Sequence, residues 1–172
     1  MNEVIQCLCT RRSVRAFQSK QVEESQLAQI LQAGTFAPSG RGMQATKMVV
    51  VQDPEVIARL SSMNAAVMGS DGDPFYGAPT VIVVFADRNR NTYIEDGSLV
   101  LGNLMNAAHA VGVDSCWIHR AREVFESEQG KALMRQWGIE EDYVGIGNCI
   151  LGYGAGDYPQ AKPRKEDQIV RV

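Results

Sequence analysis

The stretch from Gly97 to Val113 carries no formal charge, and it constrains the fold of this chain more than any other feature. We expect a helix over residues 92–111, with charges only near its start at Glu95 and Asp96. A helix that is apolar or small on every side must be buried all round. One domain of 172 residues rarely encloses a helix of about five turns, so a second subunit is the natural cover. Small residues along it would let another helix approach closely: Gly97, Ser98, Gly102, Ala107, Ala108 and Ala110. The pattern therefore predicts a homodimer, with a central core helix in a monomer as the alternative.

Strands and helices alternate along the rest of the chain. Apolar, β-branched runs predict strands at residues 47–52, 79–87, 114–119 and 143–153. Amphipathic spacing and capping residues predict helices at residues 2–9, 23–33, from 53 onward, and 123–137. Strands separated by helices, with no obvious hairpin, indicate a layered sheet of α/β type in one domain over residues 1–172. The closing segment, residues 157–172, is too short to fold alone and must lie on its own body or on a partner.

Composition excludes several classes of protein. A net charge of −3 and a pI near 5.4 argue against broad nucleic-acid binding, because the basic residues are local. The first apolar run is too short for a signal peptide, and the uncharged stretch falls short of a membrane span. We therefore expect a cytoplasmic protein with no nucleic-acid or membrane partner. The cysteines lack disulfide or zinc spacing, and we expect all four to be reduced and mostly buried: Cys7, Cys9, Cys116 and Cys149.

Three short segments are suited to contacting a ligand. The first, TRRSVRAF from Thr10, places three arginines around one serine, and close guanidiniums repel unless an anion or carboxylates lie between them. The second, residues 38–44, is a loop of small residues whose backbone can approach a flat surface closely. The third adds two cations near the end of the chain, Lys162 and Arg164. These segments could converge on one phosphate-bearing ligand; separate solvated charges are the alternative.

Other motifs are explained without a ligand. GYGAGDY from Gly152 contains GxGxG, but a Rossmann site needs a following helix and an acidic residue about twenty positions later. Only sixteen residues follow Gly156, so that reading is excluded. His109, inside the uncharged helix, is expected to be a hydrogen-bonded core residue. His119 ends a predicted strand, but no nucleophile motif accompanies it, so neither a hydrolase triad nor a metal site is predicted.

RRSVRAF near the start and APSGRGMQ about twenty residues later resemble the paired N-terminal signature of the nitroreductase family of flavin enzymes. The resemblance continues through GAPTVIVVFAD, DGSLVLGNLMNAAHAVGVDSCWIHRARE and GDYPQAKPRK, and so spans nearly the whole chain in order. Each motif is weakly specific by itself, whereas the ordered set is strong. The resemblance implies an α+β fold with a central mixed β-sheet sandwiched by helices. It also implies FMN bound at a homodimer interface and a C-terminal arm, residues 157–172, exchanged onto the partner.

The resemblance also implies contacts between FMN and individual residues. The phosphate, the ribityl chain and the pyrimidine edge would be held by Arg11, Arg12, Ser13 and Arg15. A C-terminal basic pair, Lys162 and Arg164, would complete the phosphate site. The other subunit would lay a loop against the flavin through Pro38, Ser39 and Gly40. The main chain near the reactive nitrogen would come from Trp117, Ile118 and His119. An asparagine that contacts the ring is matched by Asn64.

The function implied by the resemblance is that of an FMN-dependent NAD(P)H oxidoreductase, reducing nitroaromatics, quinones or similar flat acceptors by ping-pong hydride transfer. The flavin carries the chemistry, so no catalytic side chain is assigned, and fixed cations offset the charge gained on reduction. Gly42, Ala45 and Thr46 stand where the family's loop often has an asparagine and a proline–tryptophan pair. The short segment 87–93 leaves no room for a substrate lid, which favours an open, promiscuous pocket. A flavin-binding redox sensor or flavin store with little turnover is the alternative.

Overall fold

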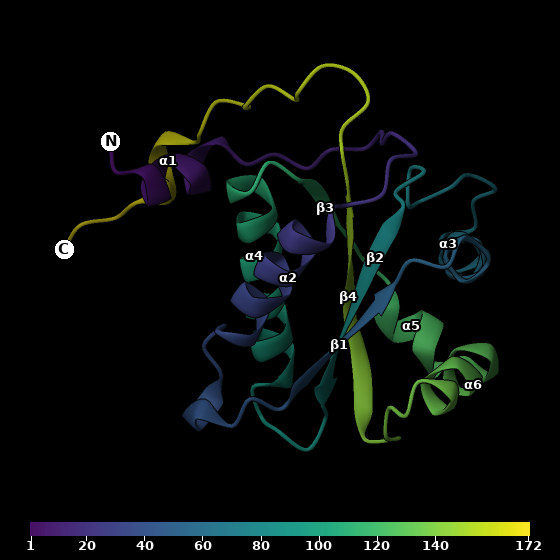
Figure 1. The fold of residues 1–172 in the computed structure, drawn as a ribbon. Helices are drawn as coiled ribbons and strands as arrows, with labels where there is room; N and C mark the ends of the chain where they lie inside the picture. The colour runs from purple at the N-terminus through teal and green to yellow at the C-terminus, as the bar shows by residue number, and fades with distance from the viewer.

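The uncharged stretch forms most of α4 (Tyr93–Ala110), which packs against one face of a four-stranded sheet in the computed structural model of residues 1–172. Figure 1 shows three layers, with α2 and α4 on one face of the sheet and α3, α5 and α6 on the other. The strands are β1 (Thr46–Val51), β2 (Thr80–Asp87), β3 (Asp114–Ile118) and β4 (Tyr143–Gly152). Their order is β1-β2-β4-β3, so β3 is an edge strand.

All three strand pairings are antiparallel, so the fold is α+β. The α+β class implied by the resemblance is confirmed, whereas the α/β reading of the strand–helix alternation is wrong. Alternation does not specify direction: α3 and the loop after it return the chain to the end of the sheet that it left, so Val51 pairs with Val81. The sheet was expected to be mixed, but its four strands are antiparallel throughout, and parallel pairing is limited to one isolated bridge, between Ser13 and Ser115.

The helices lie close to their predicted positions, with one exception. The first three along the chain are α1 (Glu3–Thr10), α2 (Glu24–Thr35) and α3 (Pro54–Met68). The single helix expected over residues 123–137 is instead two, α5 (Ala121–Glu126) and α6 (Glu128–Gln136). Ser127 separates them with an extended backbone and accepts a hydrogen bond from the Gly130 amide. A Cβ at Gly130 would lie 2.0 Å from the Val124 carbonyl oxygen, so the two helices touch where only glycine fits.

One face of α4 lies open in the single chain. Leu101 and Leu104 are fully buried against the sheet, whereas Leu99 keeps 44% of its surface exposed. A Cβ added at Gly102 would meet nothing within 4 Å. Gly97, expected to admit another helix, instead faces its own sheet, where an added Cβ would lie 2.5 Å from Ile146. The expectation of burial on every side is therefore not met within one chain.

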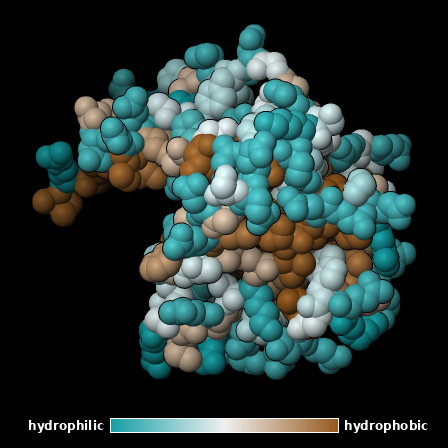
Figure 2. Space-filling view, viewed as in Figure 1, coloured by the Kyte–Doolittle hydropathy of each residue, from teal (hydrophilic) through white to brown (hydrophobic).

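Both ends of the chain project from the body on the same side (Figure 1). No residue of α1 is buried, and its apolar side chains Val4, Ile5 and Leu8 are exposed. Every residue from 160 to 172 is exposed, including three apolar ones near the end. Figure 2 shows brown apolar residues along this projection and in a band between the two helical layers. These surfaces lack a partner within the chain.

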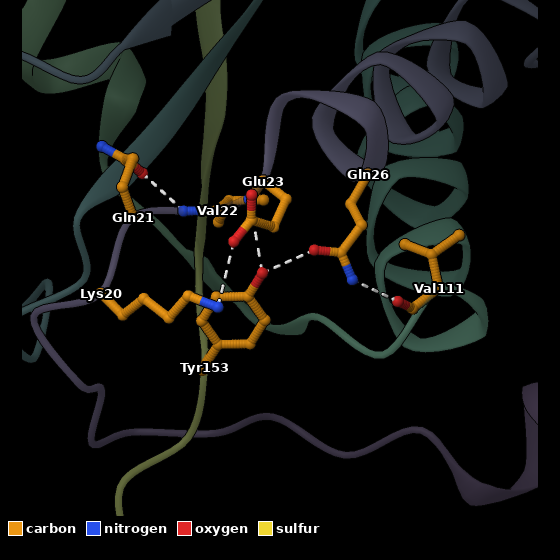
Figure 3. Close-up of polar contacts among 7 residues, drawn as sticks. All are labelled: Lys20, Gln21, Val22, Glu23, Gln26, Val111 and Tyr153. Carbon is orange, nitrogen blue, oxygen red and sulfur yellow. Dashed lines mark hydrogen bonds and ion pairs between the residues drawn. The ribbon is translucent and has the colours of Figure 1, made fainter.

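A polar network fixes the C-terminal end of α4 to α2 and β4 (Figure 3). The Tyr153 hydroxyl, just beyond β4, donates to Gln26 Oε1 at 2.5 Å and accepts from the Glu23 amide at 3.3 Å. Gln26 Nε2 in turn donates to the Val111 carbonyl at 2.7 Å, and Lys20 lies over the Tyr153 ring. The end of α4 is thereby held in a defined position beside the sheet.

The four cysteines are all free thiols. Cys116 and Cys149 are buried, Cys7 is half-buried and Cys9 is exposed, so burial holds for only two of them. Complete burial raises the pKa of the Cys149 thiol far above its usual range.

None of the helices combines the length and the apolar character that a membrane span would need.

Candidate functional site

The N-terminal basic segment lies along the free edge of β3. Arg11 ends α1, and the chain then runs extended, so that Ser13 bridges to Ser115. The Val14 amide donates to the Ser115 carbonyl at 3.1 Å, and the Val14 side chain is buried. The side chain of Val14 anchors the segment, which leaves the neighbouring polar residues beside the strand.

Two arginine nitrogens in this segment are buried without a partner, Arg11 Nη1 and Arg12 Nε. Arg12 also uses Nη1 to hold the carbonyls of Cys9 at 2.8 Å and of Arg11 at 2.7 Å. The four ion pairs of the chain all involve other residues, so no carboxylate neutralises these guanidiniums. A buried donor without an acceptor is costly, whereas a phosphate offers several charged oxygens to guanidinium donors. The residues present therefore fit an anionic group here. Arg15, in contrast, is exposed.

Three side chains that sequence reasoning did not assign to the site lie near Arg11 and Arg12. The Tyr158 hydroxyl accepts the Arg12 amide hydrogen at 2.7 Å and lies 3.3 Å from His109 Nδ1. His109 Nε2 is 2.9 Å from the Thr10 hydroxyl, and its ring stacks on Tyr158 with centroids 5.9 Å apart. Burial lowers the pKa of His109, as do the nearby Arg11 and Arg12 cations, while Asp114 acts in the opposite direction. His109 is thus hydrogen-bonded as expected, but it belongs to this cluster rather than to the core.

Beyond Ser115, the free edge of β3 presents main-chain groups on the side where the basic segment lies. Because the Ser115 carbonyl points outward to Val14, strand alternation directs the Trp117 main-chain groups to that free edge as well. Asn64, on α3, donates to the His119 carbonyl at 2.8 Å, so the structure brings these predicted residues together. Asn64 is buried, and its Oδ1 has no partner, like Trp117 Nε1. Ile118 is buried beside them, and its carbonyl accepts from Asn148 at 3.3 Å.

A cavity of about 300 Å³ opens beside this end of β3, with Trp117, His119 and Arg122 in its wall. A larger cavity, about 930 Å³, lies against α3 and the loop that follows it, and it contacts none of the predicted site residues. The unpartnered buried atoms lie on β3, on the basic segment and on Asn64 beside His119, so we place the site there rather than in the larger cavity.

Left-handed backbone conformations occur in both predicted flavin-contact segments. Arg120, directly after His119, has φ 73°, and Arg41 and Gln44 in the loop after Gly40 have φ 55° and 49°. Non-glycine residues in this region cost free energy and concentrate at functional sites. Nothing in the sequence distinguished these three residues, because their strain arises from the path of the folded chain.

The loop with Pro38, Ser39 and Gly40 lies at the opposite end of α4. The Gly40 amide donates to Asp96 Oδ1 at 2.9 Å, near the start of the helix. Asp96 and His109 are thirteen residues apart on α4, which corresponds to about 20 Å. Within one chain, the loop therefore does not reach the two arginines.

The two cations of the C-terminal arm do not reach the arginine cluster in the single chain. Lys162 and Arg164 are exposed, and Arg164 bonds only to the Lys162 carbonyl, at 3.0 and 3.3 Å. The arm contributes Tyr158 to the cluster instead. The convergence of five basic side chains on one point is thus not seen within one chain.

Comparison with known proteins gives a consistent result. A model of the nitroreductase family matches residues 8–70 and 66–154. A protein of Archaeoglobus fulgidus named "Putative NADH dehydrogenase/NAD(P)H nitroreductase" is 30% identical over 159 residues, covering 89% of this chain and 86% of that protein. A crystal structure of a nitroreductase with bound FMN from Bacteroides fragilis superimposes with a TM-score of 0.92 at 28% identity, over the whole of both chains. A second nitroreductase with bound FMN, from Desulfitobacterium hafniense, gives 0.90 at 25% identity, covering 100% of this chain and 99% of that one.

Proposed function

The chain belongs to the nitroreductase family, and from that premise we propose that it is an FMN-dependent NAD(P)H oxidoreductase. Its acceptors would be nitroaromatics, quinones or similar flat molecules. The observation that carries the proposal is the pair of buried arginine nitrogens without acceptors, Arg11 Nη1 and Arg12 Nε, beside the free edge of β3. Similar proteins of known structure that match this chain over nearly its full length contain FMN.

The basic segment and β3 would bind different parts of FMN. Arg11 and Arg12 would bind the phosphate, with the Ser13 hydroxyl close by. The main chain from Trp117 to His119 would line the ring, with Asn64 fixing the His119 carbonyl. When bound, FMN supplies the redox chemistry, accepting a hydride from NADH or NADPH and passing one to the acceptor. The fixed guanidiniums would offset the negative charge gained on reduction.

A homodimer would complete the site. The loop 38–44 and the Arg11 cluster lie at opposite ends of α4, so within one chain the loop does not reach the arginines proposed to bind the phosphate. Two chains with antiparallel α4 helices would place the loop of each beside the cluster of the other. The open face of α4 around Leu99 and Gly102 supports this arrangement, as does the exposed arm, whose Lys162 and Arg164 would then reach the partner's phosphate site.

The proposal is tested by the visible spectrum of the purified protein and by anaerobic addition of NADH or NADPH. We expect yellow protein that bleaches rapidly with at least one donor and recovers its colour when a quinone or nitroaromatic is added. Yellow protein that does not bleach with either donor would instead favour a flavin-binding sensor or store. Colourless protein that takes up no added FMN would contradict the assignment of the cofactor.

A further inference from the structure

Asp96 is a buried carboxylate in a helix that is otherwise uncharged beyond its first turn. Only 3% of its surface is exposed, and it forms no ion pair within the chain. Its Oδ1 accepts the Gly40 amide hydrogen at 2.9 Å, and its Oδ2 accepts the Thr92 hydroxyl at 3.2 Å. Burying a carboxylate without a cation is costly, so its hydrogen bonds must compensate. Apolar packing against the sheet does not require a charge at this position.

The contact with Asp96 is the one that ties the loop to α4. Within the loop, the Gly42 amide donates to the Ser39 carbonyl, and the Gln44 amide donates to the Ser39 hydroxyl. These bonds close the loop on itself, but they do not set its position on the body. Gly40 lies so close to the helix that an added Cβ would be 2.2 Å from the Thr92 hydroxyl oxygen. A larger residue at Gly40 would therefore displace the Thr92 side chain at the N-cap of α4, and with it the bond from Thr92 to Asp96.

We infer that Asp96 is a positioning residue for the loop 38–44. Through this loop it affects the binding of the flavin held by the partner subunit. This inference rests on the proposed function. The carboxylate fixes the Gly40 amide, and with it the strained residues Arg41 and Gln44, before FMN arrives. Without this bond the loop would have to be ordered at the moment of binding, and the affinity for FMN would fall.

The first test compares FMN affinities by fluorescence titration. Asp96→Ala removes a hydrogen bond to a charged group, and we expect roughly ten- to hundredfold weaker binding. Asp96→Asn retains an oxygen for the Gly40 amide and an NH₂ group for the Thr92 hydroxyl, so most of the affinity should return. Thr92→Val, at an exposed residue, removes only the second bond and should weaken binding severalfold, which keeps the test available should Asp96→Ala fold poorly. Glu95→Ala is the matched control, expected to leave the affinity unchanged. Wild-type affinity in both Asp96→Ala and Thr92→Val would overturn the inference.

The second test asks which flavin the loop serves. Chains carrying Asp96→Ala and chains carrying Arg11→Ala are given different affinity tags, and the mixed dimer is isolated. If the loop acts on the partner's flavin, one site of the mixed dimer combines an intact Arg11 with an intact loop. We then expect tight FMN binding at half the wild-type stoichiometry. If no tight site is recovered, the loop acts within its own chain and the inference is wrong. Failure of the proposed function is distinguishable, because the wild-type protein itself would then bind no FMN.

Discussion

The two ends of α4 are built in opposite ways. At its C-terminal end, His109 lies with Thr10 and Tyr158 beside two guanidiniums that have unused buried donors. At its N-terminal end, Asp96 is a buried acceptor whose bonds are made to the helix cap and to the loop. One end thus has donors to offer to an anion, whereas the other has already used its charge to hold a loop.

This difference assigns the two ends different roles: the C-terminal end would bind the ligand, and the N-terminal end positions the loop. The dipole of α4 favours cations at its C-terminal end and anions at its N-terminal end, so the helix stabilises both sets of charges. Of these two groups, only the arginine pair at the C-terminal end keeps buried donors without acceptors. We therefore expect substitutions there to change the contact with FMN directly. Substitutions at the N-terminal end should act through the loop.

The largest effect is expected from disrupting the proposed dimer, in which the loop of one chain and the arginine cluster of the other contact one flavin. Leu99→Arg places a charge on the open face of α4, where burial in a dimer would cost about 3–5 kcal/mol. We expect a monomer that loses its FMN, measured by light scattering and by flavin content of the same fractions. Val67→Arg, at a similarly exposed residue of α3, is the control and should remain dimeric. A monomeric wild type, or a monomeric variant that retains its FMN, would contradict a flavin site shared between two chains.

The next largest effect concerns the cationic end alone. Arg11→Ala should weaken FMN binding by about 1.5–3 kcal/mol, or roughly ten- to hundredfold, through loss of a charge-assisted contact. Arg164→Ala should have an effect of the same size if the arm of the partner reaches this site. Arg135→Ala, on the opposite face of the sheet, is the control. Unchanged affinity in both Arg11→Ala and Arg164→Ala, measured by fluorescence titration, would remove the phosphate-site assignment.

A smaller effect should follow from removing the hydroxyl that joins the arm to this end. Tyr158→Phe loses the bond to the Arg12 amide while keeping the ring against His109. A neutral hydrogen bond contributes about 0.5–1.5 kcal/mol, so we expect roughly two- to tenfold weaker FMN binding. Tyr143→Phe, on the far part of β4, provides the matched control. Equal affinities in the two variants would show that Tyr158 does not support the basic segment.

The smallest effect is a pH dependence of folding stability from His109. Burial, with help from Arg11 and Arg12, lowers its pKa below the ordinary 6.5, so the unfolded chain takes up the proton first. Stability should fall as the pH drops through 6.5 and level off below the lowered pKa. Urea unfolding of the FMN-free protein at about pH 5.5 and about pH 7.5, at one protein concentration, measures this difference. His109→Gln should reduce it; an unchanged difference would mean that His109 does not titrate as its surroundings require.

Much of the fold was predictable because it follows from local pattern. The β-branched run before Asp87 forms β2, and the spacing of Leu27 and Ile30 forms the buried face of α2. The break at Ser127 was not predictable, because it depends on the contact of Gly130 with a carbonyl of the preceding helix. Strand direction was missed for the same reason: it depends on where a connection returns, which no local pattern encodes.

In the candidate site, too, the residues that local sequence identifies differ from those that depend on long-range contacts. Arg11 and Arg12 were identified from a dense cationic run in an acidic chain, a signal that needs no neighbours. Tyr158 and His109 were missed, because their roles arise from contacts between residues far apart in the sequence. The expectation that Gly97 serves a partner helix was wrong, since a small residue signals close packing without saying against what.

By itself, the sequence determined which segments are helices and strands, that α4 carries almost no charge, and that arginines gather beside the first helix. These properties reside in residue type and spacing, which act over a few residues. Only the tertiary structure decided that the arginine cluster and the loop at Gly40 lie at opposite ends of one helix. That separation is set by the packing of α4 on the sheet and by the bond from Gly40 to Asp96, fifty-six residues apart, and long-range contacts of this kind form only in the folded chain.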